Sequence, residues 1–92
     1  MKYRSRFTIA SSILRTAQNG SSTKTRLMYG AYLSSVQINE YLTFLLANKL
    51  IIRDEMAHTY APSDRGIQFL RSFDEMERLS SLDESITAQV GK

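Results

Sequence analysis

Cysteine is absent from this 92-residue sequence, and His58 is its only histidine. The lack of cysteine excludes a disulfide framework, thiolate metal sites and cysteine nucleophiles. A single imidazole without a recognisable set of partner ligands predicts neither a metal site nor a bound cofactor. The four glycines are scattered and form no phosphate-binding loop, and no nucleophile-elbow motif surrounds any serine. We therefore predict no catalytic residues and no enzymatic activity.

Long apolar runs are missing too. The longest purely aliphatic stretch outside the helical patterns is the triplet Leu50-Ile51-Ile52, far below the roughly 18 residues of a membrane span. No continuous apolar segment follows the basic residues at the N-terminus, so a signal peptide is not expected. With 42% hydrophobic and 23% charged residues, the composition is typical of one small globular domain, and we predict a cytoplasmic location.

Acidic residues do not occur in the first 39 positions, which contain six lysines and arginines. Residues 64–84 show the opposite balance, with six acidic residues and three arginines. A molecule with one basic and one acidic end can turn its basic end toward a polyanion. The alternative interpretation is a chance asymmetry on a solvated surface.

Apolar residues at three- and four-residue steps predict a first helix over residues 5–19. Gly20 follows it and favours a helix end, because glycine readily adopts the left-handed conformation. A second helix is predicted from Thr23, a suitable N-cap, to the region of Gly30, where we expect glycine to make the tight turn toward Leu33.

A third helix is predicted to begin at Ser34 or Ser35 and to continue to about residue 47. Ser34 and Gln37 have the spacing of a capping box, in which each side chain bonds to the main chain of the other residue. The apolar face of this helix is formed by Ile38, Tyr41, Leu42, Leu45 and Leu46.

The apolar period changes after this helix. Residues 50–53 and 57–60 read as two short strands of a hairpin, with Pro62 ending the second strand. Ser63 is a suitable N-cap for a last helix that continues to about residue 86, a length of about 36 Å. Its buried side is predicted to hold Ile67, Phe69, Leu70, Phe73 and Met76.

Three helices, a two-stranded hairpin and a fourth helix, in that order, are typical of a winged helix-turn-helix. The fold class predicted is therefore mainly α with a small β-hairpin and an extended C-terminal helix. The second and third helices would form the helix-turn-helix, with residues 35–48 as the recognition helix and the hairpin as the wing. We assign residues 1–78 to this domain and residues 79–92 to a C-terminal extension.

Several segments of the sequence carry a resemblance to a known family. They are Lys24-Thr25-Arg26-Leu27-Met28-Tyr29, Leu33-Ser34, Tyr41-Leu42, Leu50-Ile51 and Tyr60-Ala61-Pro62-Ser63-Asp64-Arg65-Gly66. Over residues 7–73 the chain resembles the archaeal winged-helix family of small chromatin and transcription-regulator proteins. The resemblance implies binding of double-stranded DNA. It also implies, as in several members, dimerisation through a long C-terminal helix that pairs as an antiparallel coiled coil.

The sequence departs from this family at two places. Lys49 stands where the family commonly has glycine after the recognition helix. Because a left-handed lysine costs about 1 kcal/mol, we expect Asn48 to adopt the left-handed conformation instead. The predicted wing tip, Asp54-Glu55, is acidic, which weakens the case for contact between the wing and phosphate.

Two groups of residues are candidates for DNA binding. At the start of the second helix, free main-chain N–H groups and nearby positive charge suit a phosphate; this group is Thr23, Lys24, Thr25, Arg26 and Tyr29. The exposed side of the third helix would face base edges, and this group is Ser34, Ser35, Val36, Gln37, Asn39, Glu40 and Thr43.

Individual side chains of the third helix suit particular bases. Gln37 can pair bidentately with adenine, Val36 can touch a thymine methyl group, and Glu40 can accept a hydrogen bond from cytosine. The alternative for each of them is an ordinary solvent-facing position on a helix.

The last helix offers a dimer interface. Leu79, Leu82 and Ile86 follow steps of three and four, as in a coiled-coil seam. The alternative is a helix end that packs on its own domain. We predict a homodimer that binds double-stranded DNA in the nucleoid, as a transcriptional regulator or a chromatin protein. The second hypothesis is a winged-helix module for protein interaction or dimerisation without DNA binding.

Overall fold

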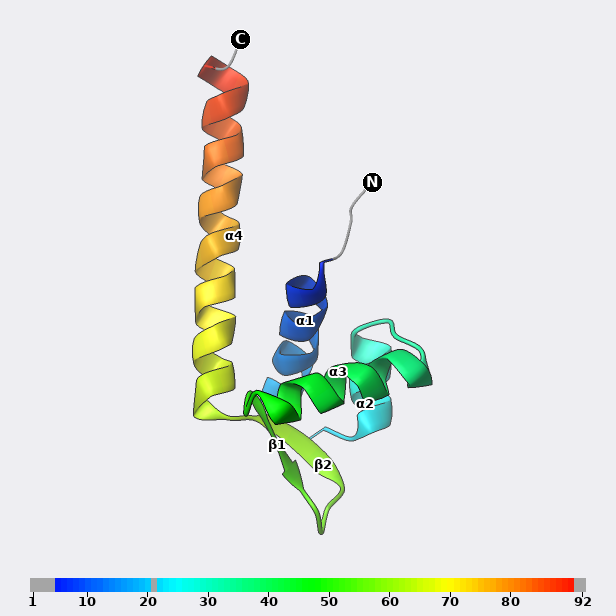
Figure 1. The fold of residues 1–92 in the computed structure, drawn as a ribbon. Coiled ribbons are helices and arrows are strands. Elements are labelled where there is room, and N and C mark those ends of the chain that lie inside the picture. Colours follow the sequence, from blue (N-terminus) through cyan, green and yellow to red (C-terminus); the bar gives the residue numbers. More distant parts are fainter. Residues whose placement is uncertain (1–4, 21, 91–92) are drawn as a thin grey trace.

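The computed structural model describes residues 5–20 and 22–90, with side chains described as far as residue 79. Helices and strands follow the predicted order (Figure 1). They are α1 (Arg6–Gln18), α2 (Lys24–Gly30), α3 (Ser35–Ala47), β1 (Ile51–Asp54), β2 (Thr59–Pro62) and α4 (Asp64–Val90). The predicted fold class, mainly helical with a two-stranded hairpin, is confirmed.

Side-chain caps fix where the first three helices begin. The hydroxyl oxygens of Ser5 and Thr23 accept main-chain N–H groups three residues later, at the starts of α1 and α2. Ser34 and Gln37 form the predicted capping box at the start of α3. Each cap supplies a partner for an N–H group that the helix itself leaves unpaired.

The turns after α2 and α3 differ from the prediction. Tyr32 and Lys49 adopt the left-handed conformation, with φ of 58° and 59°, whereas Asn48 has φ of −93°. The expectation that Asn48 would be the left-handed residue is therefore wrong. Lys49 is the left-handed residue because α3 ends in the same main-chain motif as α2. The next residue, Leu33 or Leu50, donates its N–H to a carbonyl five residues earlier.

Gly30 does not make the turn after α2, contrary to our prediction; it is required by the packing of α2 against α1. It lies within α2, and a Cβ atom there would be 2.7 Å from Oγ1 of Thr16 on α1. The small residue therefore permits α1 and α2 to approach closely, while Tyr32 makes the turn.

The two strands pair antiparallel, with Ile51 opposite Pro62 and Asp54 opposite Thr59. The second strand begins two residues later than predicted and includes Pro62 instead of ending before it. The reason is that the Asp54 carboxylate accepts the N–H groups of Met56 and Ala57, which keeps these residues in the turn. A main-chain bridge between Ser22 and Tyr60 ties the connection before α2 to β2.

A single apolar core lies among α1, α2, α3, the hairpin and the first turns of α4. Its fully buried side chains include Ile13, Leu14, Leu27, Ile38 and Leu45. On α4, Leu70 is buried as predicted, but Met76 is 63% exposed and the prediction for this residue is wrong. Met76 is exposed because α4 continues past α1 and extends away from the rest of the domain (Figure 1).

Candidate nucleic-acid interface

The exposed side of α2 carries the predicted phosphate-binding residues. Lys24, Thr25 and Arg26 are all exposed, and Tyr29 is 70% exposed. The Thr23 hydroxyl oxygen caps the helix by accepting the N–H of Arg26 at 3.3 Å. Two cationic side chains thus stand on the first turn of a helix that has no acidic residue in that turn.

The outward face of α3 carries the predicted base-reading residues. Ile38, Leu42 and Leu45 are buried and hold the opposite face in the core. The exposed candidates are Ser34, Ser35, Val36, Gln37, Asn39, Glu40 and Thr43. At about 100° per residue, the centre of this face is formed by Val36, Glu40, Thr43 and Ala47. Sequence reasoning missed Ala47, which its one-turn spacing from Thr43 would have identified.

A direct contact joins the two groups of candidates. The Lys24 ammonium group donates a hydrogen bond to Oδ1 of Asn39 at 2.9 Å. Lys24 and the face of α3 therefore belong to one continuous surface. Lys24 is the only predicted α2 side chain that hydrogen-bonds to α3 among the described residues.

Polar groups on α3 are held by further hydrogen bonds. Oε1 of Gln37 accepts the main-chain N–H of Ser34 at 3.0 Å, and the Ser34 hydroxyl oxygen accepts the N–H of Gln37 at 3.2 Å. The Thr43 hydroxyl donates to the carbonyl oxygen of Asn39 at 2.9 Å. Several candidates thus have defined orientations before any ligand is bound.

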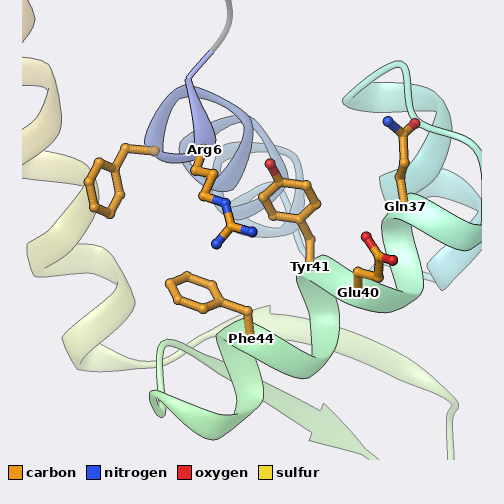
Figure 2. A pocket seen from close by; sticks show the side chains of 6 residues that line it. Arg6, Gln37, Glu40, Tyr41 and Phe44 are labelled. Carbon is orange, nitrogen blue, oxygen red and sulfur yellow. The ribbon is translucent and has the colours of Figure 1, made fainter.

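A groove of about 270 Å³ lies beside this surface, between the start of α1 and α3. Figure 2 shows the Arg6 guanidinium group in the space between Tyr41 and Phe44, with Glu40 and Gln37 along the same helix. Arg6 forms no ion pair with any residue that the structure describes. Arg6 thus adds a positive charge next to α3, which the candidate residues chosen from the sequence did not include.

The comparison with protein families decides the classification. The model of the family described as winged helix-turn-helix matches residues 3–81. The chain belongs to this winged helix-turn-helix family. It is also similar to the crystal structure of Sso10a-2, a DNA-binding protein from Sulfolobus solfataricus, with a TM-score of 0.71 and 23% sequence identity. The similarity covers 95% of this chain and 97% of that chain. No curated protein matches the sequence.

The wing of this winged helix holds its acidic residues within its own turn. Asp54 accepts main-chain N–H groups of the turn, and Glu55 pairs with Arg53 at 3.7 Å. His58 is exposed and left-handed, with φ of 55°. The wing tip therefore carries little free positive charge, as the sequence indicated.

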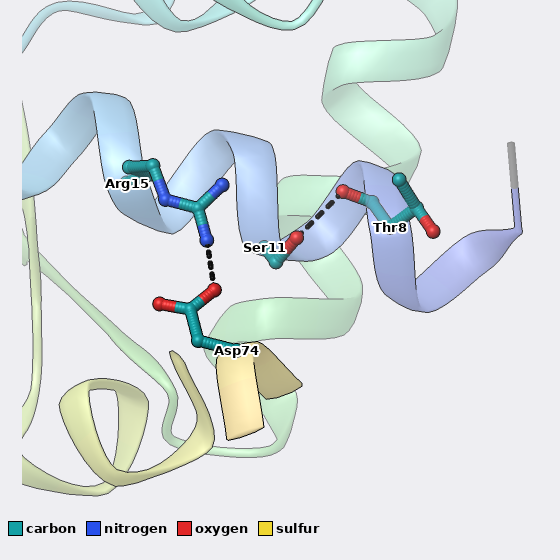
Figure 3. Close-up of polar contacts among 4 residues, drawn as sticks. All are labelled: Thr8, Ser11, Arg15 and Asp74. Atoms are coloured by element: carbon teal, nitrogen blue, oxygen red, sulfur yellow. Dashed lines mark hydrogen bonds and ion pairs between the residues drawn. The ribbon is translucent and has the colours of Figure 1, made fainter. Parts of the chain in front are cut away.

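Helix α4 of the winged helix is held against α1 by an ion pair between Arg15 and Asp74 (Figure 3). Arg78 donates a hydrogen bond to Glu75 at 2.7 Å, and this contact raises the pKa of the Arg78 guanidinium above its ordinary value. Leu79 is 48% exposed. Of the predicted dimer residues, Leu82 and Ile86 lie outside the described side chains.

Neither a metal-binding cluster nor a membrane-spanning helix is found within the described residues. Among the described side chains, no group of three histidine or acidic residues is placed to hold a metal ion. None of the helices within the described residues combines the length and apolar character that a membrane span needs.

Proposed function

We propose that this chain binds double-stranded DNA, with α3 in the major groove and the α2 side chains on the phosphates. The observation that carries the proposal is the hydrogen bond between Lys24 and Asn39, because it places a cation of α2 at the edge of the α3 face. An ammonium group has three N–H donors, so Lys24 keeps two for a phosphate while it holds Asn39. The similarity to a DNA-binding protein with the same fold supports the proposal.

The predicted contacts are proposed as they stand. Thr23, Lys24, Thr25, Arg26 and Tyr29 would position the domain on the backbone, which carries no sequence information. The α3 candidates would face base edges, with Ala47 added to them. We assign no catalytic role to the chain, and we propose that it works in the cytoplasm on nucleoid DNA, as a regulator or a chromatin protein.

Dimerisation through α4 is part of the proposal. The helix has 27 residues, a length of about 40 Å, and the molecule is 56 Å long but only 26 and 21 Å across. Met76 and Leu79 expose apolar surface on the part that extends from the domain. A second copy would cover these side chains, with residues 79–92 as the extension that pairs.

The test is a titration of a duplex of random sequence with the full chain at several salt concentrations. Fluorescence anisotropy of the duplex measures the binding. Each neutralised phosphate contributes about 0.9 to the slope of log affinity against log salt. We expect Lys24→Ala combined with Arg26→Ala to weaken binding to every duplex and to reduce this slope by about 1.8. The matched control, Arg71→Ala combined with Arg78→Ala, removes the same charge from α4 and should leave the slope unchanged. An unchanged slope in the α2 variant would refute the assigned surface.

One observation favours a second function. Glu40 places a carboxylate at the centre of the α3 face, and the phosphates on both sides of a DNA groove would repel this charge. A winged helix that binds a protein partner, and not DNA, accommodates this charge. Absence of duplex binding even at low salt would support this second function.

A further inference from the structure

We propose that α3 selects guanine–cytosine pairs over adenine–thymine pairs, because its amide side chains turn their NH₂ donors outward and their oxygens toward the protein. This inference rests on the proposed function, since it specifies which base edges the α3 face would bind. Two amides of the α3 face have orientations that are fixed by the chemistry of their hydrogen-bond partners.

The first amide belongs to Gln37. Its Oε1 atom accepts the main-chain N–H of Ser34 at 3.0 Å. A main-chain N–H can only donate, so the oxygen of the Gln37 amide must face it. The NH₂ group of Gln37 is left on the exposed surface, and no described residue accepts a hydrogen bond from it.

The second amide belongs to Asn39. Its Oδ1 atom accepts from the Lys24 ammonium group at 2.9 Å. An ammonium group has no lone pair, so Asn39 must also turn its oxygen toward the protein. Within the described residues, nothing accepts from the Asn39 NH₂ group. Both amides of the α3 face therefore present N–H donors outward.

Acceptors lie between these two amides. Glu40 and Thr43 occupy the middle of the exposed face, with Asn39 on one flank and Gln37 on the other. A carboxylate only accepts, and Glu40 forms no ion pair with a described residue. The Thr43 hydroxyl donates its hydrogen to the carbonyl oxygen of Asn39. The Thr43 oxygen can therefore act toward a ligand only as an acceptor. The face thus has donors at its edges and acceptors at its centre.

This arrangement suits one base pair better than the other. The adenine edge has an acceptor, N7, beside a donor, the N6 amino group, and an amide reads it with both its NH₂ and its oxygen. The oxygens of Gln37 and Asn39 are turned toward Ser34 and Lys24, so these amides do not present an oxygen and an NH₂ group together to an adenine edge. The guanine edge has two acceptors, N7 and O6, and its partner cytosine offers an amino group to an acceptor such as Glu40. In this inference Gln37 prefers guanine, whereas the sequence predicts that it pairs with adenine.

The test compares four duplexes of equal length and mixed sequence by fluorescence anisotropy with the full chain. They are built from guanine–cytosine, adenine–thymine, inosine–cytosine and diaminopurine–thymine pairs. Inosine–cytosine keeps the major-groove edge of guanine–cytosine but lacks its minor-groove amino group. Diaminopurine–thymine has the major-groove edge of adenine–thymine together with a minor-groove amino group. We expect the first and third duplexes to bind at least about fivefold more tightly than the other two, the lower end of what one such contact discriminates.

The outcomes separate the inference from the proposed function. Equal, salt-dependent binding of all four duplexes would overturn the inference alone. Tight binding of diaminopurine–thymine together with guanine–cytosine would also overturn it, because readout would then come from the minor groove. Failure to bind any duplex at low salt would overturn the proposed function itself.

Matched variants test the role of the oriented amide. Lys24→Met releases Oδ1 of Asn39. We therefore expect the ratio of the affinity for guanine–cytosine to the affinity for adenine–thymine to fall toward one, and the affinity for every duplex to drop. Arg26→Met removes the same charge from the same helix but leaves Asn39 held. It should weaken all four duplexes equally and keep the preference. An identical change of preference in both variants would show that the Lys24–Asn39 contact does not set selectivity.

Discussion

Gly66 packs directly against the main chain of Leu50, so closely that a Cβ atom at position 66 would lie 2.0 Å from the Leu50 carbonyl oxygen. This contact joins the first turn of α4 to the end of the α3–β1 connection. Ser63 strengthens the same junction, because its hydroxyl donates to the carbonyl of Lys49 at 2.7 Å and accepts the N–H of Gly66 at 3.0 Å. The start of α4 is thus fixed by main-chain contacts.

We predict that Gly66→Ala lowers the free energy of unfolding by about 3 kcal/mol, since the main chain must move to admit the methyl group. Urea unfolding followed by circular dichroism measures this change. Gln68→Ala, on the exposed side of the same turn, is the control and should change stability by less than about 0.5 kcal/mol. Equal stability of the two variants would contradict the packing described.

Lys49→Gly is expected to stabilise the protein by about 1 kcal/mol. Lys49 has φ of 59°, a conformation that costs a residue with a Cβ atom roughly this amount and costs glycine almost nothing. Thermal or urea unfolding would measure the gain. Lys49→Ala keeps the Cβ atom and serves as the control, which should show no comparable gain. A glycine variant less stable than the parent would refute the argument.

Thr59→Val tests a polar atom in β2. The Thr59 hydroxyl oxygen is buried and has no hydrogen-bond partner among the described residues. Replacing it with a methyl group of similar shape removes an unsatisfied buried group, so we expect a gain of about 1 kcal/mol in the free energy of unfolding. Thr25→Val, at an exposed position on α2, gives the matched change where no such gain is expected. A loss of stability in Thr59→Val would mean that the hydroxyl is paired.

Leu79→Glu tests the proposed dimer without shortening the chain. A carboxylate on the exposed apolar side of α4 would have to be buried unpaired against a second copy, which is strongly unfavourable. Light scattering should therefore report a dimer for the parent chain and a monomer for the variant. Glu77→Gln changes a neighbouring exposed residue and should remain dimeric. A monomeric parent chain would remove dimerisation from the proposal.

The element order could be predicted from the sequence because its signals are local. Serine and threonine caps and the three- and four-residue apolar steps mark the starts and buried faces of α1, α2 and α3. The exposure of the α3 candidates followed from the same periodicity.

Other features depend on contacts between distant segments and could not be predicted from local patterns. The position of Gly30 reflects the approach of Thr16 on another helix. The later start of β2 has a local cause instead, because the Asp54 carboxylate accepts N–H groups only two and three residues later. The orientation of the Asn39 amide depends on Lys24, which lies 15 residues earlier. The family resemblance pointed to glycine at position 49, but the helix-ending motif forms there with lysine.

The bridge between Ser22 and Tyr60 has a mechanical consequence. Ser22 and Tyr60 exchange main-chain hydrogen bonds in both directions, only two residues before Lys24. A hairpin bent toward a DNA backbone would therefore pull on the start of α2 and shift its cations with it. Under the proposed function, the wing and the α2 cations would therefore move together when either of them is displaced.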